Sequence, residues 1–470
     1  MRLATIVATV GPASDSELTL TQLVRAGVDV FRLNFSHGTH ADHAWCIWRI
    51  RRVARRLSRA VAILADLQGP KMRVGKMRDG GPVTLVRGQS LVLTTRTVVG
   101  DGSRLSVTYR RLPLDVQKGD TILLDDGLME LRVVAVSGRD VRCKVVVGGL
   151  LKERKGINLP GVALSAPAMT AKDVEDLRFA VARGVDYVAL SFARRREDVL
   201  ALRRKLRALG AELPIIAKIE RPEGVANLDG ILDVADGVMV ARGDLGVEAS
   251  PPEVPILQKQ IIQKANEREK LVITATQMLE SMITNPRPTR AEATDVANAI
   301  LDGTDAVMLS GETAIGQYPV EAVRMMAAIA ERAEATGLMA RPSHAGTQSL
   351  STSHAVAEAA CAAAADCAAR AVLVFTLSGA TARMLAKLRP SARIIALTPN
   401  RAVFNQMAML WGVTPALTAF GQNTEQMIAH GEAAILRRGL LKRGDTVVAL
   451  AGATGLRGAT NMMNVHRLGL

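Results

Sequence analysis

The fold is decided by residues 215–244, which read IIAKIERPEGVANLDGILDVADGVMVARGD. The stretch contains two apolar runs, Ile215–Glu220 and Gly237–Ala241, and each run ends at charged residues. Strands that are apolar without interruption are typical of parallel sheets buried on both faces, and a helix-length segment separates these two. The stretch therefore predicts a strand–helix–strand unit with parallel strands.

The same kind of run recurs on both sides of this unit. Helix-patterned stretches such as Ala171–Arg183 and Asp198–Ala208 mostly lie between the runs. With the two above there are eight, and eight such units predict a (β/α)8 barrel. The other six are Ala4–Thr9, Val28–Asn34, Val61–Asp66, Tyr187–Ser191, Leu271–Thr276 and Ala306–Ser310.

The alternation breaks twice, which predicts two further domains. Residues 71–168 hold short β-type runs with turn residues and no helical period, which is typical of an inserted small β-barrel. The (β/α)8 barrel is then made of residues 1–70 and 169–340. After a loop rich in Ser, Thr, His and Gly, strands and helices alternate again, which predicts a C-terminal α/β domain over residues 345–470.

Composition narrows the class of protein. The net charge of +15 lies largely on helix faces such as Arg49–Arg59, and aromatic residues make up only 3%, so few side chains could stack on bases. We therefore expect no nucleic-acid function, although a basic surface suits anionic substrates. No apolar run reaches the ~18 residues of a membrane span. The four cysteines show no paired spacing, so we expect a cytoplasmic protein that binds no membrane.

Polar residues gather where the predicted strands end. The carboxyl ends of barrel strands carry the active sites of such folds. Lys218 and Glu220 lie two residues apart and so point to the same side of their strand. Glu220 and Asp244, from adjacent strands, could share one Mg²⁺, which prefers carboxylate oxygens. A surface ion pair between Lys218 and Glu220 is the alternative, and the polar ends of the neighbouring strands count against it.

Six blocks of sequence resemble the pyruvate kinase family, in family order and over nearly the whole chain. They are Thr5–Ser14 (TIVATVGPAS), Phe31–His37 (FRLNFSH), Lys218–Val225 (KIERPEGV), Val240–Val247 (VARGDLGV), Ala275–Met282 (ATQMLESM) and Met308–Thr313 (MLSGET). The resemblance implies transfer of a phosphoryl group from phosphoenolpyruvate to ADP, giving pyruvate and ATP, as the final step of glycolysis. It also implies Mg²⁺ or Mn²⁺ as cofactor and a homotetramer.

The resemblance implies roles for individual residues. Lys218 would stabilise the transition state between phosphoryl group and enolate, Arg32 would hold the phosphoryl group, and Thr276 would relay a proton. Glu220 and Asp244 would bind the metal. The implied substrate-binding residues are Arg32, Ser191, Lys218, Gly243, Asp244 and Thr276, and the implied nucleotide-binding residues are Asn34, His37, Arg73 and Lys155.

Two further sites are predicted, a monovalent-cation site that departs from the family pattern and a phosphate-binding loop in the third domain. Asn34, Ser36 and Asp66 match a monovalent-cation site, but Lys71 stands where potassium-requiring relatives carry an acidic residue, so we expect that K⁺ is not required. In the third domain, a turn with the hydroxyls of Thr376, Ser378 and Thr381 is typical of a phosphate-binding loop and implies a phosphorylated-metabolite effector.

Three other interpretations remained open. The first is a metal site formed by His37, His40 and His43, for which no fourth ligand is nearby in sequence. The second is another Mg²⁺-dependent barrel enzyme that forms pyruvate enolate, such as an aldolase or carboxylyase. The third is a basic structural or RNA-binding protein. An assay for ADP-dependent pyruvate release separates the second from a kinase, and the third predicts retention on nucleic acid at moderate salt with no turnover.

Overall fold

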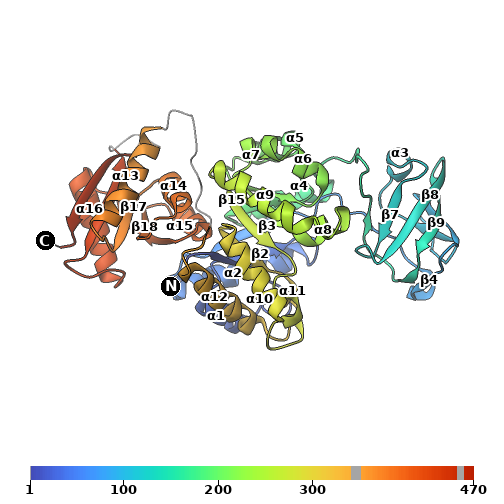
Figure 1. Ribbon diagram of the computed structural model, residues 1–470, viewed down its shortest axis with the longest axis horizontal. Coiled ribbons are helices and arrows are strands. Elements are labelled where there is room, and N and C mark those ends of the chain that lie inside the picture. Colours follow the sequence, from blue (N-terminus) through green and yellow to red (C-terminus); the bar gives the residue numbers. More distant parts are fainter. Residues whose placement is uncertain (1, 340–350, 453–459, 470) are drawn as a thin grey trace.

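A closed barrel of eight parallel strands lies at the centre of the molecule (Figure 1). The structure is a computed structural model that describes residues 2–339, 351–452 and 460–469. The first strand pairs with the second and with the last, which closes the ring and confirms the predicted barrel. The strands are β1 (Thr5–Thr9), β2 (Val30–Asn34), β3 (Ala62–Asp66), β12 (Tyr187–Leu190), β13 (Ile215–Ile219), β14 (Gly237–Ala241), β15 (Leu271–Ala275) and β16 (Ala306–Leu309).

Helices surround the barrel and bury their apolar faces against it. Three of them begin with the same capping box, in which a threonine side chain and an acidic side chain three residues later bond each other's backbone N–H group. The long helices are α1 (Glu17–Ala26), α2 (His40–Arg56), α4 (Ala171–Ala182), α5 (Arg196–Ala208), α9 (Val254–Glu267), α10 (Arg290–Leu301) and α12 (Pro319–Ala335). Shorter ones are α6 (Pro222–Ala226), α7 (Leu228–Val234), α8 (Arg242–Glu248) and α11 (Gly311–Ala314). None of the described helices is long and apolar enough to cross a membrane.

The insertion between β3 and β12 forms a body of its own at one end of the molecule (Figure 1). Its strands pair in the open order β11-β7-β8-β9-β5-β6, with β10 and β4 as a separate two-stranded ribbon. It is all-β apart from two short helical turns, and closure into a small barrel stays a prediction. The strands are β4 (Val83–Leu85), β5 (Ser90–Thr94), β6 (Arg104–Ser106), β7 (Thr121–Leu124), β8 (Met129–Ser137), β9 (Asp140–Val147), β10 (Gly149–Leu151) and β11 (Ile157–Asn158). We call residues 71–168 the lid.

The C-terminal domain lies at the opposite end (Figure 1). Its sheet has the order β19-β18-β17-β20-β21, parallel except for the last strand, as the alternating pattern predicts. The sequence pattern did not reveal α15, β19 or the exposed edge strand β21. The elements are α13 (Thr352–Asp366), β17 (Ala371–Phe375), α14 (Ala380–Leu388), β18 (Arg393–Thr398), α15 (Arg401–Gln406), β19 (Val413–Leu417), α16 (Thr424–Arg437), β20 (Thr446–Gly452) and β21 (Thr460–Arg467).

This domain is docked on the amino end of the barrel through buried charges. Lys387, fully buried at the end of α14, donates to Asp305 just before β16 and to Asn266 at 2.8 Å. Arg389 reaches the same carboxylate and donates to the carbonyl oxygen of Gly303 at 2.7 Å. The two cations therefore join α14 to the barrel.

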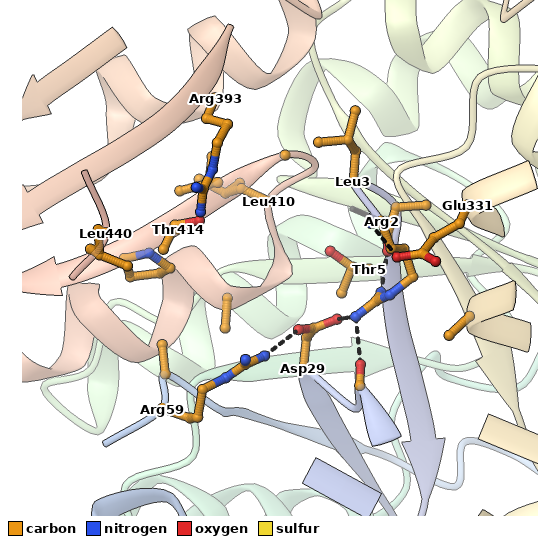
Figure 2. A pocket seen from close by; sticks show the side chains of 18 of the residues that line it. Arg2, Leu3, Thr5, Asp29, Arg59, Glu331, Arg393, Leu410, Thr414 and Leu440 are labelled. Carbon is orange, nitrogen blue, oxygen red and sulfur yellow. Dashed lines mark hydrogen bonds and ion pairs between the residues drawn. The ribbon is translucent and has the colours of Figure 1, made fainter. Parts of the chain in front are cut away.

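A cavity of about 400 Å³ lies beside this contact, between the barrel and the C-terminal domain (Figure 2). Arginines from both bodies line it, and only part of their charge is balanced. Arg2 donates to Asp29 at 2.7 Å, and Arg59 approaches the other oxygen of that carboxylate at 3.7 Å. Burial, and then the nearby charge of Arg59, lower the pKa of Arg438, which also lines the cavity.

Candidate active site

Lys218 lies at the carboxyl end of β13 and contacts three neighbouring strand ends. Its Nζ donates to Ser191 Oγ and to Glu220 Oε1, both at 2.8 Å, and lies 3.3 Å from Asp66 Oδ1. Burial works against the charged ammonium, but the Asp66 and Glu220 carboxylates outweigh it and raise the pKa of Lys218 above that of a free lysine. Lys218 is therefore a permanent cation inside a polar cluster.

Asp66 ties Arg32 to this cluster. Arg32 Nε and Nη2 lie 2.7 Å and 2.6 Å from Asp66 Oδ2, and Arg32 Nη1 donates to Thr9 Oγ1 at 3.0 Å. Burial would raise the pKa of Asp66, but Lys218 and Arg32 hold it below its ordinary value. The Lys218 ammonium has a contact for each of its three hydrogens, whereas the Arg32 guanidinium keeps further N–H groups for an anion at the barrel mouth.

Glu220 and Asp244 are the two carboxylates at this edge of the barrel that could hold a divalent cation. Glu220 is buried, and its Oε2 accepts the backbone N–H of Phe192 at 2.6 Å. Burial, together with the negative charges of Asp244 and Asp66, outweighs Lys218 and raises the pKa of Glu220 to about 7. Among the described residues no donor bonds the Asp244 carboxylate. Two hard oxygen ligands with unbalanced negative charge fit Mg²⁺ or Mn²⁺.

Thr276 and Gly243 are already bonded to each other. The Gly243 N–H donates to Thr276 Oγ1 at 2.7 Å, and that hydroxyl donates to the carbonyl oxygen of Ala275. Thr276 and Gln277 both have positive φ, 68° and 53°, a conformation that costs a non-glycine residue energy. The side chain of Arg242 holds this turn by donating to the Thr276 carbonyl oxygen at 2.8 Å.

The loop after β2 brings the predicted cation-site residues together. Asn34 pairs with Asp66 in the sheet, and Asn34 Oδ1 accepts the N–H of Ser36 at 3.1 Å. Burial, then the charges of Lys71, Arg73 and Arg32, lower the pKa of His37, so the imidazole is neutral at pH 7.

The three histidines of this region do not converge. His43 Nε2 bonds the His37 carbonyl oxygen, and His40 Nε2 bonds Asp176 instead. Within the described ranges no group of three or more His, Cys, Asp or Glu side chains could hold a metal.

The base of the lid carries Arg73 and Lys155 side by side. Arg73 forms a backbone bridge with Gly156, and Lys155 Nζ lies 2.7 Å from Asp125. A cavity of about 640 Å³ lies between the lid and the barrel mouth. Its lining includes Lys71, Asp126, Arg242, Gly243, Asp244 and Gln277.

The predicted effector loop opens α14, far from this site. Two of its three hydroxyls are buried and engaged internally: Thr376 Oγ1 accepts the Gly379 N–H at 2.9 Å, and Thr381 Oγ1 lies 2.6 Å from Thr460 Oγ1. Ser378 is exposed, and its Oγ accepts only the N–H of Ala380, at 3.4 Å, among the described contacts.

Sequence reasoning missed the side chains that fix the lid to the barrel. Arg221 donates to the carbonyl oxygen of Leu159 at 2.8 Å, and Arg194 donates to that of Leu164 at 2.6 Å. Asp173 accepts the N–H of Gly69 at 3.0 Å. Arg221 lies inside the KIERPEGV block, and the Thr170-x-x-Asp173 capping box was readable from the sequence.

The two larger parts of the chain match family models. Residues 1–323 match the model described as the barrel domain of pyruvate kinase, and residues 354–466 match the model described as its alpha/beta domain.

Full-length relatives give the same result. The chain is 46% identical over 474 residues to pyruvate kinases of Staphylococcus aureus and Staphylococcus epidermidis, which covers 100% of this chain and 81% of each relative. The crystal structure of a pyruvate kinase from Cryptosporidium parvum superposes with a TM-score of 0.92 at 36% identity, covering 99% of this chain and 96% of that one.

Proposed function

The chain belongs to the pyruvate kinase family, and from this premise we propose how its residues carry out transfer from phosphoenolpyruvate to ADP. The observation that carries the proposal is the cluster around Lys218, where one ammonium contacts Ser191, Asp66 and Glu220 from three strand ends. During transfer, negative charge moves from the phosphoryl group to the enolate oxygen. A fixed cation with a raised pKa stabilises that charge without giving up its proton.

Arg32 holds the transferring phosphoryl group, since its planar guanidinium is oriented by Asp66 and Thr9. The substrate carboxylate meets the backbone N–H groups of Gly243 and Asp244 at the start of α8. Because the Gly243 N–H now bonds the Thr276 hydroxyl, the substrate displaces that hydroxyl as it binds. Thr276 is thereby freed, beside the substrate, to relay a proton to the enolate carbon.

Glu220 and Asp244 hold Mg²⁺ or Mn²⁺, as their unbalanced charge supports. A divalent cation held by these two carboxylates would supply positive charge to stabilise substrate oxygens during transfer. The nucleotide phosphates are bound by Arg73 and Lys155 at the lid base, with Asn34 and His37 beneath them. Closure of the lid excludes water from the transfer.

Lys71 replaces a monovalent cation, because it lies between lid and barrel and its charge acts on His37. Asn34, Ser36 and Asp66 then need no K⁺. Asp66 is already occupied by Arg32 and Lys218, which supports a site that works without a further cation.

A phosphorylated metabolite binds the loop of Thr376, Ser378 and Thr381, through Ser378 and the N–H groups that begin α14. The active form is a homotetramer in the cytoplasm.

The experiment that tests the proposal is a coupled assay for pyruvate release with phosphoenolpyruvate, ADP and Mg²⁺. Pyruvate release that depends on ADP is the expected result. Release of pyruvate from other substrates without ADP would select the alternative of an aldolase or carboxylyase. Retention on RNA with no turnover would select a binding protein.

A further inference from the structure

Asp173, near the start of α4, bonds both chain segments that connect the lid to the barrel. Its Oδ1 accepts the Gly69 N–H at 3.0 Å. Its Oδ2 accepts the N–H and the hydroxyl of Thr170, both at 2.7 Å. Gly69 precedes the lid and Thr170 follows it. The Asp173 carboxylate, which is 0% exposed, therefore joins the two ends of the insertion where they meet the barrel.

The two connecting segments meet again inside the lid. Val74 N–H donates to the Lys155 carbonyl oxygen, and Ile157 N–H donates to that of Met72, both at 3.0 Å. The entering segment is bonded to Asp173 at Gly69 and to the returning segment at Met72. Only Pro70 and Lys71 lie between these two bonds. The returning segment is longer and is fixed to the barrel by the arginines described above. The short entering segment is therefore the pivot of the lid.

The residues just before this pivot contact the cluster around Lys218. Gly69 has φ +69°, and a Cβ there would come within 3.0 Å of the Ser191 and Phe192 side chains. Ser191 Oγ donates to the Leu67 carbonyl oxygen at 2.7 Å and accepts from Lys218. A shift of this segment would therefore act on Ser191 through its bond to Leu67, and Ser191 in turn accepts from Lys218.

A second capping box in the same chain shows that helix capping by itself does not require the acidic side chain to bond a third group. Thr39 and Asp42 cap α2 with the same pair of bonds, but Asp42 is exposed and, in the described structure, accepts from no residue other than Thr39. The third bond of Asp173, to Gly69, is thus additional to its capping role.

We infer that Asp173 is a positioning residue that sets the pivot of the lid and, through Gly69 and Ser191, the position of Lys218. This inference rests on the proposed function, because it assumes that transfer takes place under the lid. It predicts that a weaker bond between Asp173 and Gly69 impairs transfer to ADP more than binding of phosphoenolpyruvate to the barrel.

The test compares Asp173→Asn with Asp42→Asn, the same change in the exposed box. Asparagine turns one acceptor oxygen into a donor that faces N–H groups. We expect kcat/KM for ADP to fall about tenfold in Asp173→Asn, because small misplacements of reacting groups are costly. Phosphoenolpyruvate binding with Mg²⁺, followed by calorimetry, should stay near the parent value, and Asp42→Asn should match the parent in both. Hydrogen exchange should quicken in residues 67–72 and stay slow in β5.

If Asp173→Asn does not fold, Thr170→Val keeps the side-chain shape but removes the hydroxyl bond to the Asp173 carboxylate and the capping bond from the Asp173 N–H. Thr39→Val removes the matching pair of bonds and is its control. A smaller loss in the same direction is expected. Kinetics and exchange equal to those of the control variants would overturn the inference and leave Asp173 as a helix cap. A parent without ADP-dependent activity would refute the proposed function, but exchange in residues 67–72 would still decide whether Asp173 sets the pivot.

Discussion

The barrel buries one lysine at each end, in opposite electrostatic surroundings. At the carboxyl end, Lys218 and Arg32 face Asp66, Glu220 and Asp244, so negative charge is in excess. At the amino end, the single carboxylate of Asp305 faces two cations, Lys387 and Arg389. The pKa of Lys218 is raised, whereas burial lowers the pKa of Lys387 despite Asp305.

The difference separates a cluster in which carboxylates are in excess from a contact between two domains in which cations are in excess. The excess of carboxylates at the carboxyl end leaves room for a divalent cation, and that end opens on a cavity. At the amino end, Lys387 itself has no access to solvent: it is 0% exposed, and its bonds go to two barrel residues. Burial of a lysine is therefore no sign of function by itself, and the balance of charge around it is more informative.

The strongest test of the comparison is Lys218→Met. Pyruvate formation should be lost while phosphoenolpyruvate still binds with Mg²⁺ and the fold persists, because the ammonium acts on the transition state. The coupled assay and calorimetry measure the two effects. Retention of more than about a tenth of kcat, a loss of only some 1.4 kcal/mol, would contradict the role.

Removing a carboxylate at the same end should act through the metal. Glu220→Gln and Asp244→Asn each take an anionic oxygen from a hard cation, so both should need more Mg²⁺ for half-maximal activity. Titration of activity with Mg²⁺ measures this. Curves that overlay the parent would place the metal elsewhere.

At the amino end the same kind of change should cost stability instead. Lys387→Met leaves Asp305 buried with one cation fewer, and the free energy of unfolding should fall by about 3 kcal/mol, while kcat stays close to the parent. Urea unfolding and the coupled assay check both. Adding Asp305→Asn should restore part of the loss; a large fall in kcat with stability unchanged would show that this lysine also serves catalysis.

A third lysine, the exposed Lys71, tests whether the carboxyl end of the barrel works without a monovalent cation. The parent should run at close to full rate in a buffer free of Na⁺ and K⁺, with tetramethylammonium as counter-ion. Lys71→Glu should lose activity there and recover part of it with K⁺, since an ammonium at ~4 Å attracts phosphate oxygens by several kcal/mol at intermediate dielectric. Strong K⁺ stimulation of the parent would show that Lys71 points to solvent.

The smallest expected effect is a pH slope from Lys387. Its folded pKa lies below the unfolded value of 10.5, so between the two the unfolded state binds more protons. The free energy of unfolding of the parent should therefore rise with pH in that window, relative to Lys387→Met. Urea unfolding at several alkaline pH values measures the difference. Parallel slopes would mean that Lys387 keeps an ordinary pKa.

The sequence predicted the carboxyl end far better than the amino end, for a geometric reason. Lys218 and Glu220 share a side of one strand because they are two residues apart, and strand ends meet at one edge of the barrel. Lys387 finds Asp305 and Asn266 only after the third domain docks, and no local period encodes that contact. Asp173 lay in a readable capping box, but its bond to Gly69 required the path of the lid segments.

The closed order of the barrel strands also bears on how the chain is made. β3 pairs with β12, which is synthesised only after the whole lid. β1 pairs with β16, which is the last barrel strand to be synthesised. The lid has its own core and can fold while the ribosome is still making the rest. During that time β1, β2 and β3 can form only three of the eight barrel strands, whose edges and apolar faces are open to aggregation. A nascent chain stalled when residue 168 has just left the ribosome should therefore bind chaperones through its first strands while its lid already resists proteolysis.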